Sequence, residues 1–267
     1  MQLSASTTYC ESKFMKVYSV ENEFGDPVGL PVGEISKPSL PDESVTLTGN
    51  YCYLEVLDAD KHTAELWSVY SLDTDGRLWT YMPQGPFSSE SEYRTWVEGV
   101  AHKADPFFYA IIDSETNKAV GVASYLRVDP NNYSIEVGWI TYSPVIQQKP
   151  IATEAMYLMM KNAFDLGYRR YEWKCNSLNL PSINAAMRLG MSFEGLFRQM
   201  SIVKGQNRDT AWFSILDRDW PVAQDAYVAW LDPENFDADG NQILRLSDLT
   251  APIVESRWPN LSLDVQR

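Results

Sequence analysis

The spacing of hydrophobic residues changes near the middle of the chain. Over Ser134–Tyr142 apolar and polar residues alternate, with Ile135 and Val137 on one side, which predicts a β-strand. From Pro150 the apolar residues recur at helical spacing as far as Gly167, and proline and glycine are favoured at the start and just past the end of a helix. The sequence therefore predicts a strand followed by a helix at its centre.

The same criteria predict further elements on both sides of this unit. Predicted helices cover 59–70, a segment after Glu92, 181–189 and 220–230, and predicted strands cover 49–56, 106–113, 119–128, 169–175, 193–203 and 209–216. Their order is typical of an α+β (α/β) domain. We expect one mixed, mostly antiparallel sheet of about seven strands with helices on both faces.

Composition divides the chain into three parts. Residues 1–45 contain repeated Pro and Gly without a sustained period, which predicts an extended N-terminal arm. Residues 46–220 hold the predicted sheet as a single domain. Residues 221–267 are expected to form a C-terminal helix and a surface tail or dimer contact. The sequence therefore does not decide between a monomer and a homodimer.

The loop between the central strand and helix suits an anion. Gln147, Gln148 and Lys149 precede the helix, where backbone N–H groups and the positive end of the helix dipole face the end of the strand. Such a junction occurs in every α/β protein, and most of them bind nothing there. The spacing alone therefore does not identify a ligand.

Three segments carry a resemblance to a known family. They are I-E-V-G-W-I followed by A-T-E-A-M, then N-S-L-N-L-P-S-I-N-A-A-M-R-L-G-M, then F-E-G-L-F-R followed by R-D-T-A-W-F-S-I-L. In this order, over residues 47–220, the chain resembles the GCN5-related N-acetyltransferase (GNAT) superfamily, and within it the branch of RimJ and RimL. The resemblance implies acetyl-CoA as cosubstrate and transfer of its acetyl group to a primary amine by direct attack.

The resemblance also implies where acetyl-CoA binds. The pyrophosphate would lie on the loop and first helical turn, and pantetheine would lie beside the central strand. The implied cofactor-binding residues are Trp139, Ile140, Thr141, Gln147, Gln148, Lys149, Ala152, Thr153 and Asn179. Pro150 stands where the family usually has glycine, and proline lacks an amide donor. We expect weaker binding, or an anion held by the amides of Lys149, Ala152 and Thr153 instead.

Two residues are candidates for proton transfer. Acceptor amines are mostly protonated at neutral pH, so a base is needed, and Glu136 on the apolar central strand is the first candidate. The alternative is a buried structural glutamate bonded to an arginine. By resemblance Ser182 would protonate the leaving thiolate, although Asn179 and Ser182 are also ordinary capping residues. Ala186 and Ser201 stand where relatives often carry a tyrosine and an acidic residue.

The sequence does not identify the amine that accepts the acetyl group. Trp79, Tyr81 and Phe87 form a candidate aromatic wall for it, but aromatic residues beside prolines also form small cores. A protein N-terminus fits the resemblance, whereas an amino sugar, a polyamine or another small amine fits the aromatic residues. The alternative functions are an acyl-CoA-binding regulatory module without catalysis and a pure interaction protein.

Charge and composition disfavour several classes of binding partner. A net charge of −14 disfavours nucleic acid, whose phosphates need clustered Lys and Arg, and would attract a cationic amine. The chain has no apolar run long enough to span a membrane and no secretory signal, so we expect a cytoplasmic or nuclear protein without a membrane partner. Cysteine and histidine spacing predicts no metal site.

Overall fold

A computed structural model describes residues 17–259. Its main sheet has eight strands in the order β3-β4-β5-β6-β7-β8-β10-β9, and all neighbours are antiparallel except β7 and β8. The strands are β3 (Leu47–Thr48), β4 (Cys52–Val56), β5 (Phe107–Asp113), β6 (Lys118–Asp129), β7 (Ser134–Tyr142), β8 (Arg170–Asn176), β9 (Ser192–Val203) and β10 (Gln206–Leu216). The predicted mixed, mostly antiparallel sheet is confirmed, with the two-residue β3 as an additional strand.

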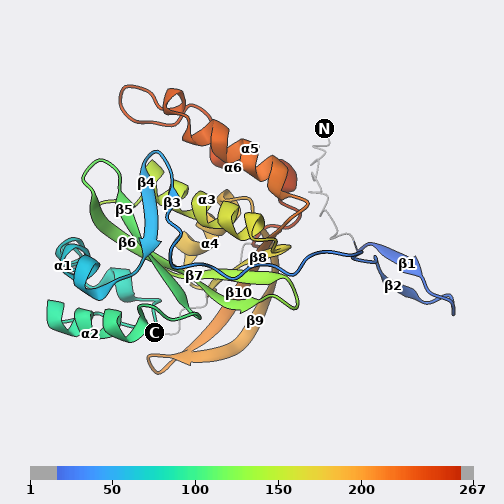
Figure 1. Cartoon of the computed structure of the whole chain (residues 1–267), viewed down its shortest axis with the longest axis horizontal. Helices are drawn as coiled ribbons and strands as arrows, with labels where there is room; N and C mark the ends of the chain where they lie inside the picture. Colours follow the sequence, from blue (N-terminus) through green and yellow to red (C-terminus); the bar gives the residue numbers. More distant parts are fainter. Residues whose placement is uncertain (1–16, 260–267) are drawn as a thin grey trace, which may run out of the picture.

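Helices cover both faces of this sheet (Figure 1). Helices α1 (Ala59–Tyr70) and α2 (Glu90–Val100) pack on one face, and α3 (Pro150–Asp165) and α4 (Leu180–Arg188) pack on the other. Strand β5 contributes to both layers, because Tyr109 and Ile111 point to the core beneath α3 while Phe108 and Ala110 point to the core beneath α1 and α2. The predicted helices on both faces are confirmed.

Strands β7 and β8 separate part-way along their length. Their parallel pairing ends at Val137 and Trp173, although β7 continues to Tyr142. At Trp139 the backbone is left-handed (φ 52°), and the β6–β7 register shifts at this point, which marks a β-bulge. A bulge bends its strand, so the edge of β7 beyond Val137 faces an opening instead of a partner strand.

The chain after residue 220 packs against the domain. Helix α5 (Trp220–Leu231) lies beside α3, where Trp220 stacks on Phe164 at 5.0 Å between ring centroids (Figure 1). A 3-10 turn (Pro233–Asn235), the short α6 (Leu246–Leu249) and a second 3-10 turn (Ala251–Ile253) follow. Because Leu246 and Ile253 are buried in the main core, residues 246–253 are part of the body, where we expected a surface tail.

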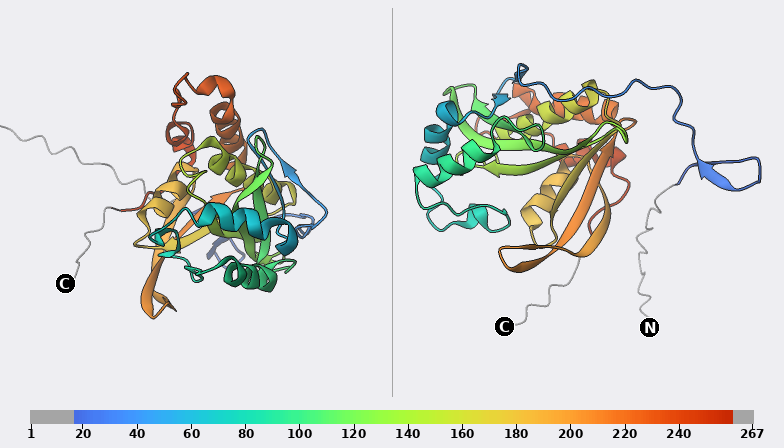
Figure 2. Two further views of the ribbon diagram at one scale, coloured as in Figure 1. Left: turned by 90° about the vertical axis from the view of Figure 1, so that its left-hand side faces the viewer. Right: turned by 60° about the horizontal axis from the view of Figure 1, so that its bottom comes forward.

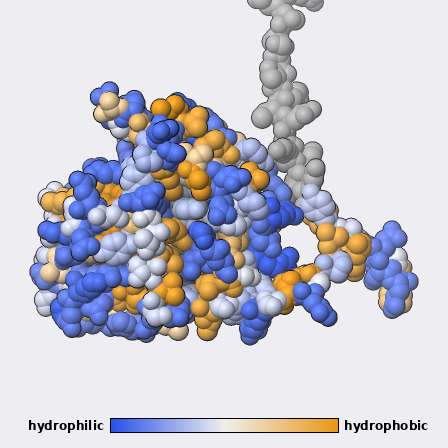
Figure 3. Space-filling model, turned by 45° about the horizontal axis from the view of Figure 1, so that its top comes forward, coloured by the Kyte–Doolittle hydropathy of each residue, from blue (hydrophilic) through white to orange (hydrophobic). Residues whose placement is uncertain are grey.

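The N-terminal segment leaves the body as a hairpin. Strands β1 (Ser19–Glu21) and β2 (Pro27–Gly29) form this hairpin, which stands away from the main sheet in Figure 1 and in the right-hand view of Figure 2. Residues 30–46 then run along the body, where the Ser39 N–H donates to the carbonyl of Leu166. The hairpin exposes hydrophobic residues such as Phe24, and elsewhere on the face in Figure 3 apolar groups lie among polar ones.

A 3-10 turn, Arg77–Trp79, lies in the connection between α1 and α2. The outermost parts of the predicted arm and tail, residues 1–16 and 260–267, lie outside the described residues. Within 17–259, no helix combines the length and hydrophobicity needed to cross a bilayer.

Candidate active site

A cleft of 1510 Å³ occupies the opening between β7 and β8. It is lined by both strands, the start of α3, helix α4, the connection 72–83 and part of the C-terminal segment. The structure brings eleven of the predicted site residues together on its walls: Tyr81, Glu136, Trp139, Ile140, Gln147, Gln148, Lys149, Ala152, Thr153, Asn179 and Ser182. Thr141, Trp79 and Phe87 do not line it.

The start of α3 forms one end of the cleft. Lys149 is the N-cap residue and its side chain makes no capping hydrogen bond, while Pro150 occupies the first turn. The Lys149 N–H donates to the carbonyl of Ile146 and the Ala152 N–H donates to the carbonyl of Lys149, both at 3.2 Å. Two of the three amides that we expected to hold an anion are therefore already bonded within the protein.

Basic side chains surround this end of the cleft. Arg188 Nη1 donates to Thr153 Oγ1 at 2.9 Å, and its guanidinium stacks over Trp230 at 4.6 Å. Arg245, from the segment after α5, lines the same cleft. Seven Lys or Arg residues and three Asp or Glu residues line the whole cleft, in a chain whose net charge is −14. The cleft is thus a cationic site on an acidic protein, which suits an anionic ligand.

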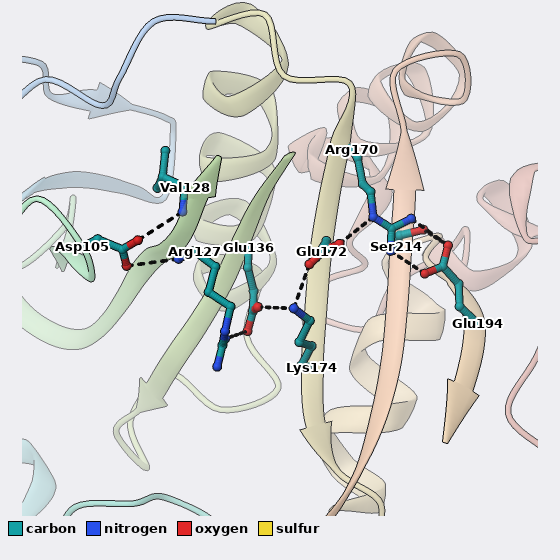
Figure 4. Close-up of polar contacts among 9 residues, drawn as sticks. All are labelled: Asp105, Arg127, Val128, Glu136, Arg170, Glu172, Lys174, Glu194 and Ser214. Atoms are coloured by element: carbon teal, nitrogen blue, oxygen red, sulfur yellow. Dashed lines mark hydrogen bonds and ion pairs between the residues drawn. The ribbon is translucent and has the colours of Figure 1, made fainter. Parts of the chain in front are cut away.

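Glu136 lies on the α1/α2 face of the sheet and is 3% exposed. Its Oε1 accepts a hydrogen bond from Arg127 Nη1 at 2.7 Å, and its Oε2 lies 2.8 Å from Lys174 Nζ (Figure 4). Burial raises the pKa of Glu136 above its usual value, and Lys174 and Arg127 limit the rise. The expected side-chain direction, opposite to Ile135 and Val137, is confirmed, and the arginine partner is the one expected of the alternative, a buried structural glutamate.

Further ion pairs continue from Glu136 across the sheet. Figure 4 shows six charged side chains in one row, which we call the charge ladder: Arg127, Glu136, Lys174, Glu172, Arg170 and Glu194. Its members come from β6, β7, β8 and β9, where sheet register aligns Glu136 with Glu172. Burial alone would raise the pKa of Glu172, but hydrogen bonds from Lys174 and Arg170 outweigh it and lower that pKa.

Ser182 lies on the opposite side of the strand opening from Glu136. Its Oγ accepts a hydrogen bond from Trp173 Nε1 at 3.0 Å, which leaves its own hydroxyl hydrogen available for donation. Asn179 caps α4, because its Oδ1 accepts from the Ser182 N–H at 3.2 Å. Burial raises the pKa of the neighbouring Cys175 to about 11, so this thiol stays protonated at neutral pH.

The predicted aromatic wall is mostly a second core. Trp79 is 5% exposed and packs edge-on against Tyr70 and Phe87, and Phe87 packs against Tyr93. Trp79 and Phe87 therefore fill the space between α1 and α2 and turn away from the cleft. Only Tyr81 lines the cleft, and its hydroxyl donates to the carbonyl of Leu178 at 3.0 Å.

Thr141 also belongs to the interior. Its side chain is buried, and its hydroxyl donates to the Trp139 carbonyl at 3.3 Å. Its own carbonyl accepts a hydrogen bond from Tyr70. These bonds hold the bulged part of β7 in place, so Thr141 supports the cleft wall from behind.

Comparison with known proteins agrees with this geometry. A family model described as an acetyltransferase (GNAT) domain matches residues 56–192, more than half of the chain. The chain belongs to the GNAT superfamily. A GCN5-related N-acetyltransferase structure from Brucella melitensis is 42% identical, with a TM-score of 0.80, and the match covers 82% of this chain and 100% of that chain.

Two further relatives of this GNAT protein extend the comparison. The N-acetyltransferase YnaD of Bacillus subtilis is 26% identical over 156 residues, which covers 57% of this chain and 88% of YnaD. A Salmonella typhimurium acetyltransferase that modifies the N-terminal serine of ribosomal protein L7/L12 is 21% identical with a TM-score of 0.56, over 64% of this chain and 99% of that one. At this identity the likeness concerns the fold, and it agrees with the RimL-like resemblance.

Several cleft residues of this GNAT protein escaped prediction from the sequence. They are Arg127, Lys174, Arg188 and Arg208, together with the C-terminal residues Trp230 and Arg245. Arg188 and Arg208 stand inside motifs that carry the resemblance, but nothing in those motifs marks them as cleft residues, and the other four lie outside the motifs. The alternation of Glu172 and Lys174 within a predicted strand was a signal for Lys174, because it places two opposite charges on the same face.

Proposed function

We propose that this GNAT protein is an acetyl-CoA-dependent N-acetyltransferase that acetylates a primary amine by direct attack, with a protein N-terminus or a small amine as acceptor. One observation carries the proposal. The opening between β7 and β8 joins a cationic end at α3 with Glu136 on the other face of the sheet, and Ser182 lines the same cleft. A cosubstrate and an acceptor can thus approach one point from opposite faces.

The residues at the α3 end fit the phosphates of acetyl-CoA. Lys149, Arg188 and Arg245 supply positive charge, and the first turn of α3 supplies its dipole. The unpaired edge of β7 around Trp139 and Ile140 would accept the amide groups of pantetheine. When bound, acetyl-CoA supplies an acetyl thioester that an amine can attack.

Glu136 and Ser182 would move the protons. An ammonium acceptor must lose a proton, and a buried carboxylate of raised pKa is a suitable base, directly or through a water molecule. Ser182 accepts from Trp173, which leaves its hydroxyl hydrogen free, and this O–H would donate to the departing sulfur. A backbone N–H on the free edge of β7 would stabilise charge on the carbonyl oxygen during attack.

The alternative function is a regulatory module that binds acyl-CoA without catalysis. Two observations favour it. Arg127 and Lys174 hold the Glu136 carboxylate, which is the geometry of a structural ion pair. Ala186 stands at the position where relatives often have a tyrosine, and its buried methyl group cannot act as an acid.

Calorimetric titration with acetyl-CoA, followed by thiol release against a panel of peptides, amino sugars, polyamines and amino acids, tests the proposal. We expect saturable binding and turnover with one class of amine. Binding without turnover on any amine would select the regulatory module. Absence of binding would overturn both functions and show that Pro150 closes the phosphate site.

A further inference from the structure

The charge ladder is electrically balanced. It contains three cations and three anions in alternation, and each ion has a partner of opposite charge: Arg127, Lys174 and Arg170, with Glu136, Glu172 and Glu194. The ladder therefore needs no further counter-ion. Any additional charge on this face of the sheet must find its partner elsewhere.

Arg208 is such an additional charge. It lies on β10, and its Nε donates to Thr210 Oγ1 at 3.3 Å, two residues further along the strand. Trp212 continues this row and packs under Lys174, whose Nζ lies 3.7 Å from the ring centroid. Arg208 thus extends the face that carries the charge ladder, and it lines the cleft.

No carboxylate within residues 17–259 pairs with Arg208 at 4.0 Å or less, although the residue is half-buried. The carboxylates around it are engaged. Glu136 is held by two cations, and Asp209 accepts from the Gln199 N–H on the neighbouring strand. Burial lowers the pKa of Arg208, and the nearby Cys175 and Glu136 offset only part of this effect.

Carboxylates on the opposite wall are also engaged. Asp75 pairs with Arg77, and Asp73 accepts from the Leu78 N–H within the same connection. The connection is held over the cleft at two points, because Tyr81 donates to the Leu178 carbonyl and Lys204 donates to the Trp79 carbonyl. Among the described residues that line this end of the cleft, Arg208 is therefore an arginine without a carboxylate partner.

We propose that Arg208 binds a carboxylate of the acceptor, so that the acceptor is a small amine of the amino-acid type. This inference rests on the proposed acetyltransferase function and names its acceptor class. One unpaired guanidinium matches one carboxylate in charge and geometry. A polyamine would instead place a second cation beside Arg208, and a phosphate would bring a second negative charge.

Matched acceptor pairs test the inference. The panel contains free amino acids with their C-terminal amides, and glucosamine 6-phosphate with glucosamine. We measure thiol release from acetyl-CoA, and in parallel the calorimetric affinity of each compound for the CoA-loaded protein. We expect the carboxylate form to be preferred to its amide by about 10- to 100-fold in kcat/KM.

Variants of Arg208 assign this preference to one side chain. Arg208→Gln should raise KM for the carboxylate acceptor by about 10- to 100-fold and leave kinetics with the amide nearly unchanged, because only the charged partner is lost. Arg208→Lys should retain part of the preference. Arg198→Gln is the matched control, because Arg198 is an exposed residue of β9 outside the cleft. This variant should leave the kinetics with both substrates unchanged.

The outcomes separate this inference from the proposed function. Equal affinity for acid and amide, an Arg208→Gln variant that weakens both equally, or binding of no carboxylate amine overturns the inference. Preference for the phosphate pair alone overturns it as well. A carboxylate preference in calorimetry without thiol release supports the Arg208 site and contradicts the acetyltransferase function.

Discussion

The strongest stability prediction concerns Glu154 on α3. This carboxylate is 2% exposed and accepts three backbone N–H groups from the β3–β4 turn, those of Asn50, Tyr51 and Cys52, at 2.8, 2.6 and 2.7 Å. The three bonds connect α3, whose first turn lines the cleft, to a turn about one hundred residues earlier in the sequence. Glu154→Gln keeps the size of the side chain and replaces one acceptor oxygen by an NH₂ group, which cannot accept.

The magnitude follows from the three bonds. In the best orientation the amide oxygen faces Tyr51 and Cys52, and the NH₂ group opposes the Asn50 N–H. One buried donor then loses its acceptor, at a cost of about 1–3 kcal/mol, and two charge-assisted bonds become ordinary ones. We therefore expect a loss of about 3 kcal/mol, equivalent to a urea midpoint lower by about 1 M at an m value of about 3 kcal/mol/M.

Urea unfolding followed by tryptophan fluorescence measures this loss. Glu115→Gln, at an exposed position of the β5–β6 turn, is the control and should lie within about 0.5 kcal/mol of the parent. Gly49→Ala should also destabilise, because an added Cβ would lie 2.4 Å from Glu154 Cδ. An unchanged midpoint in Glu154→Gln would refute the argument that these three bonds hold α3 to the turn.

Three further predictions concern the cleft. Glu136→Gln should lower turnover about 10²-fold with little change in acetyl-CoA affinity. Equal turnover of the variant and the parent at every pH would remove Glu136 from the mechanism. Pro150→Ala restores an amide donor and should tighten acetyl-CoA binding about 5-fold by calorimetry; weaker binding would indicate that the fixed backbone matters more. The folded-state pKa values of Glu172 and Glu194 lie below the ordinary 4.5, so their ion pairs stabilise the fold fully above that pH and lose this contribution as pH falls below it. Acid titration of the urea midpoint should therefore show a steeper loss in the parent than in Glu172→Gln, and parallel curves would contradict the assignment.

Local sequence determined much of the fold. The α1 boundaries follow from short-range signals, since Asp58 caps the helix and apolar residues recur at helical spacing. The central strand, Pro150 at the start of α3 and the loop before it follow in the same way. These features depend on residues within one or two turns of each other, so their physical causes are visible in the sequence.

The tertiary structure was needed to see which charged side chains pair with each other across the sheet. Glu136 was recognisable as an unusual glutamate, but its contacts with Arg127 and Lys174 depend on the register of β6, β7 and β8. The surplus cation at Arg208 is visible only once the other ions of that face are paired. Pairing is a property of the assembled sheet, because each strand contributes one or two charges to it.

Packing decided which predicted residues reach the cleft. Trp79 and Tyr81 are two positions apart, yet the first is buried against Tyr70 and the second lines the cleft. Local sequence patterns were enough to predict the strand and helix that frame the site and to carry the family resemblance. Which side chains face the cleft, and which charges lack a partner, could be known only from the folded chain, because burial and pairing arise from contacts between segments far apart in the sequence.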